Sequence, residues 1–219
     1  MQTSPARILL CAAALCIAAN VATAATGSVA NLAEALRIPT VSQDQRDHID
    51  YSAFLSFLAF LEQTYPGLHA RLEVERVNDY SLLIRWPGTS TALAPVLFEA
   101  HYDVTPIEPG TEGDWTHPPF AGAVADGYLW GRGAVDDKLS VIAMFEALES
   151  LSAEGYRPER DLYIAIGHDE EIGGDQGAAA IADLLAERDV HFTYMIGEGG
   201  LIVDRFPAVP DHTVALVAL

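Results

Sequence analysis

The sequence has 219 residues and half of them are apolar, so the chain can form one sizeable domain with a full hydrophobic core. Its 31 acidic residues outnumber 12 basic ones and give a formal net charge of −19 at pH 7. A surface of this sign repels phosphate backbones and anionic membranes, so nucleic-acid binding is disfavoured. Several glutamates are expected only to coat a solvated surface: Glu73, Glu75, Glu149, Glu154 and Glu187.

The first residues resemble an export signal. Arg7 is followed by an apolar run from Ile8 to Val21 that is short for a membrane span, and Ala22-Thr23-Ala24 has the small-residue pattern of a cleavage site. We expect residues 1–24 to be removed and the protein to be periplasmic or secreted, without stable membrane insertion. An uncleaved membrane anchor is the alternative. Any metal must be bound by His, Asp and Glu, because both cysteines lie in this segment, at Cys11 and Cys16.

Two helices are predicted after this segment. A short one is expected at Val29 to Leu36 and a longer one at Tyr51 to Tyr65, where apolar and aromatic residues recur at helical spacing. Pro66-Gly67 is expected to end the longer helix. The recurring residues should be buried in the core: Phe54, Phe57, Leu58, Leu61 and Tyr65.

Strands and helices alternate through the rest of the chain. Elements of these lengths predict an α/β fold, with a mixed or parallel sheet covered by helices on both faces. The connection from Ile107 to Asp126, rich in Pro and Gly, is long enough to indicate a functional role. The expected elements are strands at Leu72 to Val77, Ser81 to Trp86 and Val96 to Ala100, a helix at Lys138 to Ala153, a strand at Leu162 to Gly167, a helix at Gly177 to Arg188, and strands at Phe192 to Ile196 and Thr213 to Leu219.

Three polar clusters follow strand-like runs, at Pro95 to Ala100, Gly127 to Gly131 and Leu162 to Gly167. Ligands of an open α/β site gather where the carboxyl ends of strands meet. The clusters therefore predict a site for a pair of divalent metals, with zinc the leading candidate and Co²⁺ or Mn²⁺ as alternatives. They are His101-Tyr102-Asp103, Asp136-Asp137-Lys138 and His168-Asp169-Glu170-Glu171.

The first two clusters offer distinct metal-binding groups. Residues two apart in an extended segment project to the same side, so His101 can bind a metal while Asp103 accepts the other imidazole N–H. Asp137 fits a helix cap, whereas Asp136, after the tight turn Gly131 to Ala134, can bridge two cations. This Gly-x-Gly turn is not a dinucleotide loop, because Asp136 replaces the third glycine and would repel a pyrophosphate.

Two further acidic features follow later strands. Glu170 and Glu171 are adjacent carboxylates that repel each other unless a cation lies between them or one is protonated, so one should bind metal while the other handles protons. Glu198 lies between glycines after the strand expected at Phe192 to Ile196, where it can approach a metal closely. The His-Glu-x-x-His pattern of single-zinc proteases is absent from the sequence.

Five ordered motifs resemble one family of enzymes. They are HYDVTP from His101, W-x-x-PPF-x-G from Trp115, DGYLWGRGAVDDK from Asp126, GHDEEIGG from Gly167 and GEGG from Gly197. The sequence from about Leu32 to Leu219 is similar to the aminoacylase/carboxypeptidase family of dinuclear zinc peptidases. Within it, the resemblance is nearest to the carboxypeptidase S and N-fatty-acyl-amino-acid hydrolase branch.

The resemblance implies a role for each candidate residue. His101 matches a ligand of the first zinc, with Asp103 as its supporting carboxylate, and Asp136 matches the carboxylate that bridges both zinc ions. The resemblance also implies that the Asp136-Asp137 peptide bond is cis. Glu170 matches the general base. The remaining ligands of the first and second zinc correspond to Glu198 and Glu171, respectively.

The reaction implied is hydrolysis of an amide in N-acyl amino acids or in short peptides with a free C-terminus. Two cations would lower the pKa of a water, Glu170 would take its proton, and the amide carbonyl would be polarised by zinc. Glu170 would then return the proton to the leaving amine. Dipeptides and acylated diamino acids are alternative substrates within the family.

The sequence departs from the family pattern after the GEGG motif. Members continue into a lid and dimerisation domain and then a segment with another zinc-ligating histidine, which His212 does not match. We therefore expect residues 25–219 to be the N-terminal portion of a catalytic domain with an incomplete second zinc site, and a homodimer only where the lid is present. A truncated, non-catalytic metal-binding protein is the alternative. Residues 25–219 alone are expected to aggregate and to hydrolyse N-acyl amino acids negligibly.

Overall fold

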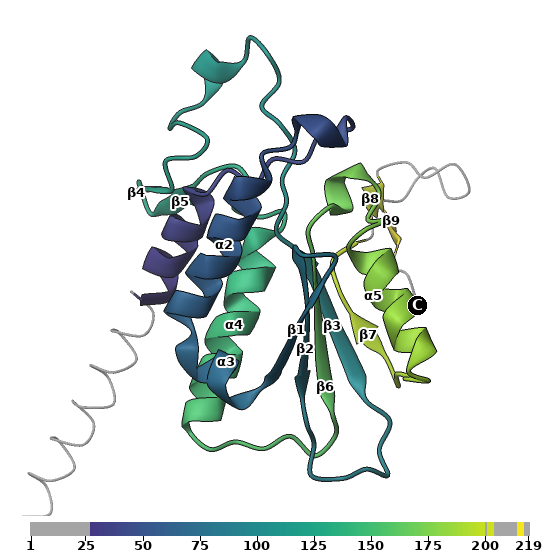
Figure 1. Ribbon diagram of the computed structural model, residues 1–219. Coiled ribbons are helices and arrows are strands. Elements are labelled where there is room, and N and C mark those ends of the chain that lie inside the picture. Colours follow the sequence, from purple (N-terminus) through teal and green to yellow (C-terminus); the bar gives the residue numbers. More distant parts are fainter. Residues whose placement is uncertain (1–26, 200, 204–213, 217–219) are drawn as a thin grey trace, which may run out of the picture.

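The computed structural model describes residues 27–199, 201–203 and 214–216, and the expected export signal lies outside them. A five-stranded sheet runs through the middle of the fold in the order β1-β2-β6-β3-β7 (Figure 1). β1 and β2 run antiparallel to their neighbours, while β6, β3 and β7 are mutually parallel, so the mixed sheet predicted from the sequence is confirmed. The strands are β1 (Glu73–Val77), β2 (Ser81–Trp86), β3 (Val96–His101), β6 (Leu162–Gly167) and β7 (Met195–Ile196).

Helices cover both faces of this sheet, as the alternating pattern predicts (Figure 1). One face carries the helical residues 27–36 together with α2 (Tyr51–Thr64), α3 (Pro66–Arg71) and α4 (Lys138–Ala153). The other face carries α5 (Ala178–Glu187). Each face of the sheet has a hydrophobic core, and β6 contributes side chains to both because alternate side chains of a strand point to opposite faces. Ile164 and Ile166 lie in the larger core, and Tyr163 and Ala165 lie in the smaller one.

The apolar stripe of α2 is buried as predicted. The five residues predicted to be buried, four in the helix and Tyr65 just beyond its end, are at most 3% exposed: Phe54, Phe57, Leu58, Leu61 and Tyr65. Full burial of side chains of this size stabilises the fold by roughly 1.5–3 kcal/mol each. Asp50 caps the start of the helix, and its carboxylate accepts the N–H of Ser52 at 3.1 Å.

The longer helix ends before Pro66-Gly67, as predicted, but the short helix that follows it was not predicted. Pro66 begins the short helix α3, a first-turn position that proline tolerates because its missing N–H has no partner there. The carboxylate of Glu149 on α4 accepts the N–H groups of Gly67, at 3.1 Å, and Leu68. Glu149 therefore caps α3 and is not one of the purely solvated glutamates.

The expected strand at Gly127 to Gly131 does not belong to the main sheet. It is β5 (Tyr128–Trp130), which pairs with β4 (Ala123–Ala125) in a separate hairpin. The long connection before it also contains the 3₁₀ turn η2 (Glu112–Asp114). Asp136 thus stands on a turn entering α4 and not at the end of a sheet strand.

The end of the described chain is only partly as predicted. β7 has two residues where five were expected. β8 (Leu201–Val203) pairs antiparallel with β9 (Val214–Leu216), which falls within the strand expected at Thr213 to Leu219. His212 lies outside the described residues. Across the described ranges, no helix combines the length and the apolar character needed to cross a membrane.

Candidate metal centre

The centre of the site is the imidazole of His101, which is fully buried at the carboxyl end of β3. Its Nδ1 lies 3.2 Å from Oδ1 of Asp103, the supporting carboxylate that the sequence predicts. Its Nε2 faces three other carboxylates: Oδ1 of Asp136 at 2.9 Å, Oε1 of Glu198 at 3.1 Å and Oε2 of Glu170 at 3.7 Å. Strand and turn segments far apart in the sequence thus bring five predicted site residues together.

The turn that carries Asp136 depends on close backbone packing. Gly133 has φ +80°, and a Cβ there would lie 2.6 Å from Cγ1 of Val104. The Asp136-Asp137 peptide bond is cis, as the resemblance implies. Asp137 occupies the N-cap position of α4, as expected, although its side chain makes no capping hydrogen bond among the described residues. The side chain of Asp136 is 65% exposed to solvent.

Asp103 does more than orient the histidine. Its fully buried carboxylate accepts the backbone N–H of Glu170 through Oδ1 and that of Glu171 through Oδ2, each at 3.1 Å. Oδ2 also accepts the hydroxyl of Ser42 at 2.6 Å. One carboxylate therefore joins the end of β3, the segment after residue 41 and the 3₁₀ turn η3 (Glu170–Ile172).

Glu171 lies beside the cluster but faces a different partner. Its Oε1 accepts the backbone N–H of Thr105 at 3.2 Å. Within the described residues, the group whose donor atoms all lie within 4.8 Å of one another consists of His101, Asp136 and Glu198. The structure thus gathers the residues predicted for the first metal and holds Glu171 at their edge.

The charges in the cluster strongly favour a cation. Burial by itself lowers the pKa of His101, but the hydrogen bond and charge of Asp103, together with Glu198 and Glu170, outweigh it and raise the pKa to about 10. Burial and neighbouring carboxylates, including Asp136, raise the pKa of Glu198 and Glu171. The carboxylates therefore oppose one another's ionisation unless a positive charge lies among them.

The donor set fits a divalent metal ion. One imidazole nitrogen and the oxygens of two carboxylates converge, which is the mixture of ligands that zinc accepts. In the part of the chain that the structure describes, no arginine or lysine forms an ion pair with Asp136, Glu170, Glu171 or Glu198, so His101 is their charged neighbour. A metal ion would balance this charge.

Lys138 fixes the start of α4 directly after Asp136. The side chain is fully buried, and its Nζ donates to the backbone oxygens of Ala35 at 2.9 Å and Ile38 at 2.6 Å. The ammonium also lies 5.0 Å from the ring centre of Phe57. Burial lowers the pKa of Lys138 to about 7. The lysine was visible in the sequence, but its partners are 100 or more residues away, so spacing gave no signal for them.

Buried contacts of Asp169 and His168 also support the turn that carries Glu170. Arg46 donates through Nη1 to Oδ2 of Asp169 at 3.1 Å, and the carboxylate of Asp169 is 1% exposed. His168, which precedes it, is buried, and its Nδ1 lies 2.6 Å from the hydroxyl oxygen of Ser81. These two members of the third cluster therefore hold the turn in place, while Glu170 projects into the site.

A mixed sheet lies between helical layers, and a histidine and carboxylates that fit a metal ion converge at the end of β3. The family model described as peptidase family M20/M25/M40 matches residues 97–210, more than half of the chain. The chain belongs to this family, which confirms the resemblance seen in its motifs.

The relatives lie in the branch that the motifs indicate. Carboxypeptidase S of Saccharomyces cerevisiae is 38% identical over 196 residues, which cover 84% of this chain and 34% of the relative. The N-fatty-acyl-amino acid synthase/hydrolase PM20D1.1 of Danio rerio is 39% identical over 192 residues, which cover 86% of this chain and 36% of the relative. The chain therefore spans about a third of the length of these relatives.

A solved structure supports the fold. Human carnosine dipeptidase 1 superposes with a TM-score of 0.61 at 22% identity, covering 81% of this chain and 39% of that chain. At this identity the similarity bears on the fold alone, and it agrees with the α/β architecture predicted from the sequence.

Proposed function

We propose that this chain carries the metal-binding part of a hydrolase that cleaves an amide bond in N-acyl amino acids or in short peptides with a free C-terminus. The observation that carries the proposal is the convergence of Asp136, Glu198 and Glu170 on Nε2 of His101, at 2.9, 3.1 and 3.7 Å. The names of the relatives, carboxypeptidase S and N-fatty-acyl-amino acid synthase/hydrolase, agree with this reaction class.

Two divalent ions, with zinc the first candidate, are the proposed cofactor. His101, Asp136 and Glu198 would hold one ion, and Asp136 and Glu171 would contribute to the other. When bound, such ions lower the pKa of a water molecule and polarise an amide carbonyl. The crowding of carboxylates around His101 supports a cation at this place, because the single positive charge of His101 does not balance them.

Glu170 is the proposed general base. Its carboxylate is 46% exposed and lies 3.7 Å from Nε2 of His101, so it can reach both solvent and a substrate beside the cluster. Its backbone N–H is held by Asp103 at 3.1 Å, which fixes the turn from which the side chain extends. Glu170 would take a proton from the attacking water and deliver it to the departing nitrogen.

The test is Glu170→Gln, measured in parallel for turnover and for bound metal. The substitution keeps the size of the side chain and removes the base, so turnover of N-acyl amino acids should fall by a factor on the order of a hundred to ten thousand. Metal content should stay the same. Undiminished turnover would refute the role of Glu170, whereas loss of metal would reassign it as a ligand.

Export is a separate proposal, based on the sequence at residues 1–24. Determining the first residue of the protein recovered from the periplasm or the medium tests it. A protein that begins at Ala25 agrees with cleavage, and a protein that retains Met1 contradicts it.

A further inference from the structure

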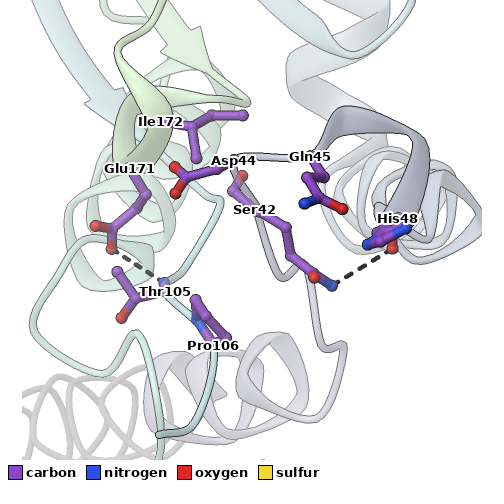
Figure 2. Close-up of a pocket in the computed structure, with 9 residues that line it drawn as sticks. Ser42, Asp44, Gln45, His48, Thr105, Pro106, Glu171 and Ile172 are labelled. Atoms are coloured by element: carbon purple, nitrogen blue, oxygen red, sulfur yellow. Dashed lines mark hydrogen bonds between the residues drawn. The ribbon is translucent and has the colours of Figure 1, made fainter.

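A hollow of about 470 Å³ opens beside Glu171, on the side of the metal centre formed by residues 42–48 (Figure 2). In Figure 2, Gln45 and His48 lie on one side, and Glu171, Ile172 and Thr105 on the other. Because Glu171 also lies beside the metal cluster, a molecule whose amide reaches that cluster can extend into this hollow. We call it the 42–48 pocket.

The wall formed by residues 42–48 is anchored at two points to the metal centre. Near its start, Ser42 donates its hydroxyl to Asp103 at 2.6 Å and its backbone N–H to the oxygen of Val104 at 3.0 Å. Near its end, Arg46 binds the buried carboxylate of Asp169 at 3.1 Å. The pocket wall and the Glu170 turn therefore share their supports, so the pocket has a defined position relative to the reacting groups.

Polar side chains dominate the lining of the 42–48 pocket. Gln43 and Gln45 offer amides, Asp44 and Glu171 offer carboxylates, and Thr105 offers a hydroxyl. Among the described residues that line the pocket there is no arginine or lysine, and the basic side chain there is the imidazole of His48. A hydrocarbon chain seated here would remove these groups from water without replacing their hydrogen bonds, which is unfavourable. An anionic group would meet carboxylates of the same sign.

The group that suits this lining is a primary ammonium. It carries three N–H donors and no acceptor, which matches a wall rich in carboxylate and amide oxygens. Its positive charge is attracted to Asp44, which stays available even when Glu171 is engaged by a metal ion.

We propose that the 42–48 pocket is a substrate subsite that receives a primary ammonium group, so that the enzyme prefers substrates carrying a free amine near the scissile amide. This inference rests on the proposed function. It makes that function more specific, because it favours peptides with a free amine over substrates with long acyl chains. The amine can be the α-amino group of a peptide or the side chain of a lysine.

The experiment compares two matched pairs of substrates on the full-length metal-loaded enzyme. Ala-Phe against N-acetyl-Ala-Phe tests the α-amino source, and N-acetyl-Lys-Phe against N-acetyl-norleucyl-Phe tests the side-chain source. Asp44→Asn should reduce the preference for the amine, expressed as a ratio of KM values, by roughly two- to fivefold in at least one pair. Asp44→Lys should abolish it. The matched control is Asp47→Asn, which removes one exposed charge from the same segment outside the pocket lining and should keep the original ratio.

A binding measurement separates this inference from the proposed function. Isothermal titration of the same two pairs into metal-depleted protein needs no turnover, and the amine-bearing member should bind more tightly in a way that depends on Asp44. If none of the substrates is hydrolysed but this preference persists, the proposed function fails and the subsite stands. If the amine gives no advantage in either pair, or if Asp47→Asn abolishes the preference as Asp44→Asn does, the subsite is refuted.

Discussion

Asp103→Asn should destabilise the protein strongly, although it changes only one buried atom from oxygen to nitrogen. The carboxylate accepts four hydrogen bonds, from Nδ1 of His101 at 3.2 Å, Oγ of Ser42 at 2.6 Å, and the backbone N–H groups of Glu170 and Glu171 at 3.1 Å each. An amide has one acceptor oxygen, so the donors on its other side would face an NH₂ group. Those two donors would be left buried without a partner.

The magnitude follows from these contacts. A buried donor that loses its acceptor costs about 1–3 kcal/mol, so two of them should lower the free energy of unfolding by about 2–6 kcal/mol. This is a large part of the roughly 5–15 kcal/mol that stabilises a typical domain. Metal affinity should also fall by about ten- to a hundredfold, because the carboxylate that orients His101 and the Glu170 turn is lost.

Urea unfolding of the metal-free protein, followed by circular dichroism, measures the first effect, and zinc titration measures the second. Ser42→Ala is the matched control, since it removes one donor and leaves the carboxylate with its other three partners. Its cost should be only about 0.5–1.5 kcal/mol. The reasoning is refuted if Asp103→Asn unfolds at the same urea concentration as Ser42→Ala.

Three further predictions concern the metal, the pH dependence and the α3 cap. Asp136→Ala should reduce bound zinc to near zero by elemental analysis, whereas Glu171→Ala should lose at most one ion; equal losses would argue against a bridging Asp136. In metal-free protein, the pKa of His101 is raised to about 10 from an unfolded value of about 6.5. Its stabilisation should therefore be complete below about pH 6.5 and disappear as the pH rises toward 10, a dependence that thermal unfolding should find missing in His101→Asn. Glu149→Ala should lower the free energy of unfolding by about 0.5–2 kcal/mol because two N–H groups of α3 lose their acceptor. The exposed Glu154→Ala should change it by less than about 0.5 kcal/mol, and similar values for both would rule out the cap.

The sequence was sufficient to predict the layers of the fold because its periodicity is strong. The stripe from Phe54 to Leu61 could only be buried on one side of a helix, and the apolar runs between helices could only form a covered sheet. It was not sufficient for α3, since Pro66 reads equally as the end of one helix or the start of the next. The group that decides between them, Glu149, is 82 residues from Gly67.

The same limit applies to the site. His101, Asp136, Glu170 and Glu198 have side chains of the types that bind metals or transfer protons, so residue type and motif order were enough to make them candidates. The connections that Asp103 makes to Ser42 and to the Glu170 turn join segments more than 60 residues apart, and no local spacing predicts them. The 42–48 pocket exists only where that segment packs against the turn, so it too could be found only in three dimensions.

Lys138 offers a way to observe the turn that carries Asp136 in the unmodified protein. It is the only lysine in the sequence, and its amine is enclosed by backbone oxygens of Ala35 and Ile38. An amine-reactive reagent can therefore reach it only when the start of α4 separates from residues 35–38. The rate of acylation at this one side chain, followed by mass spectrometry of the peptide that contains it, would report how often the turn opens, and it should slow when metal is added.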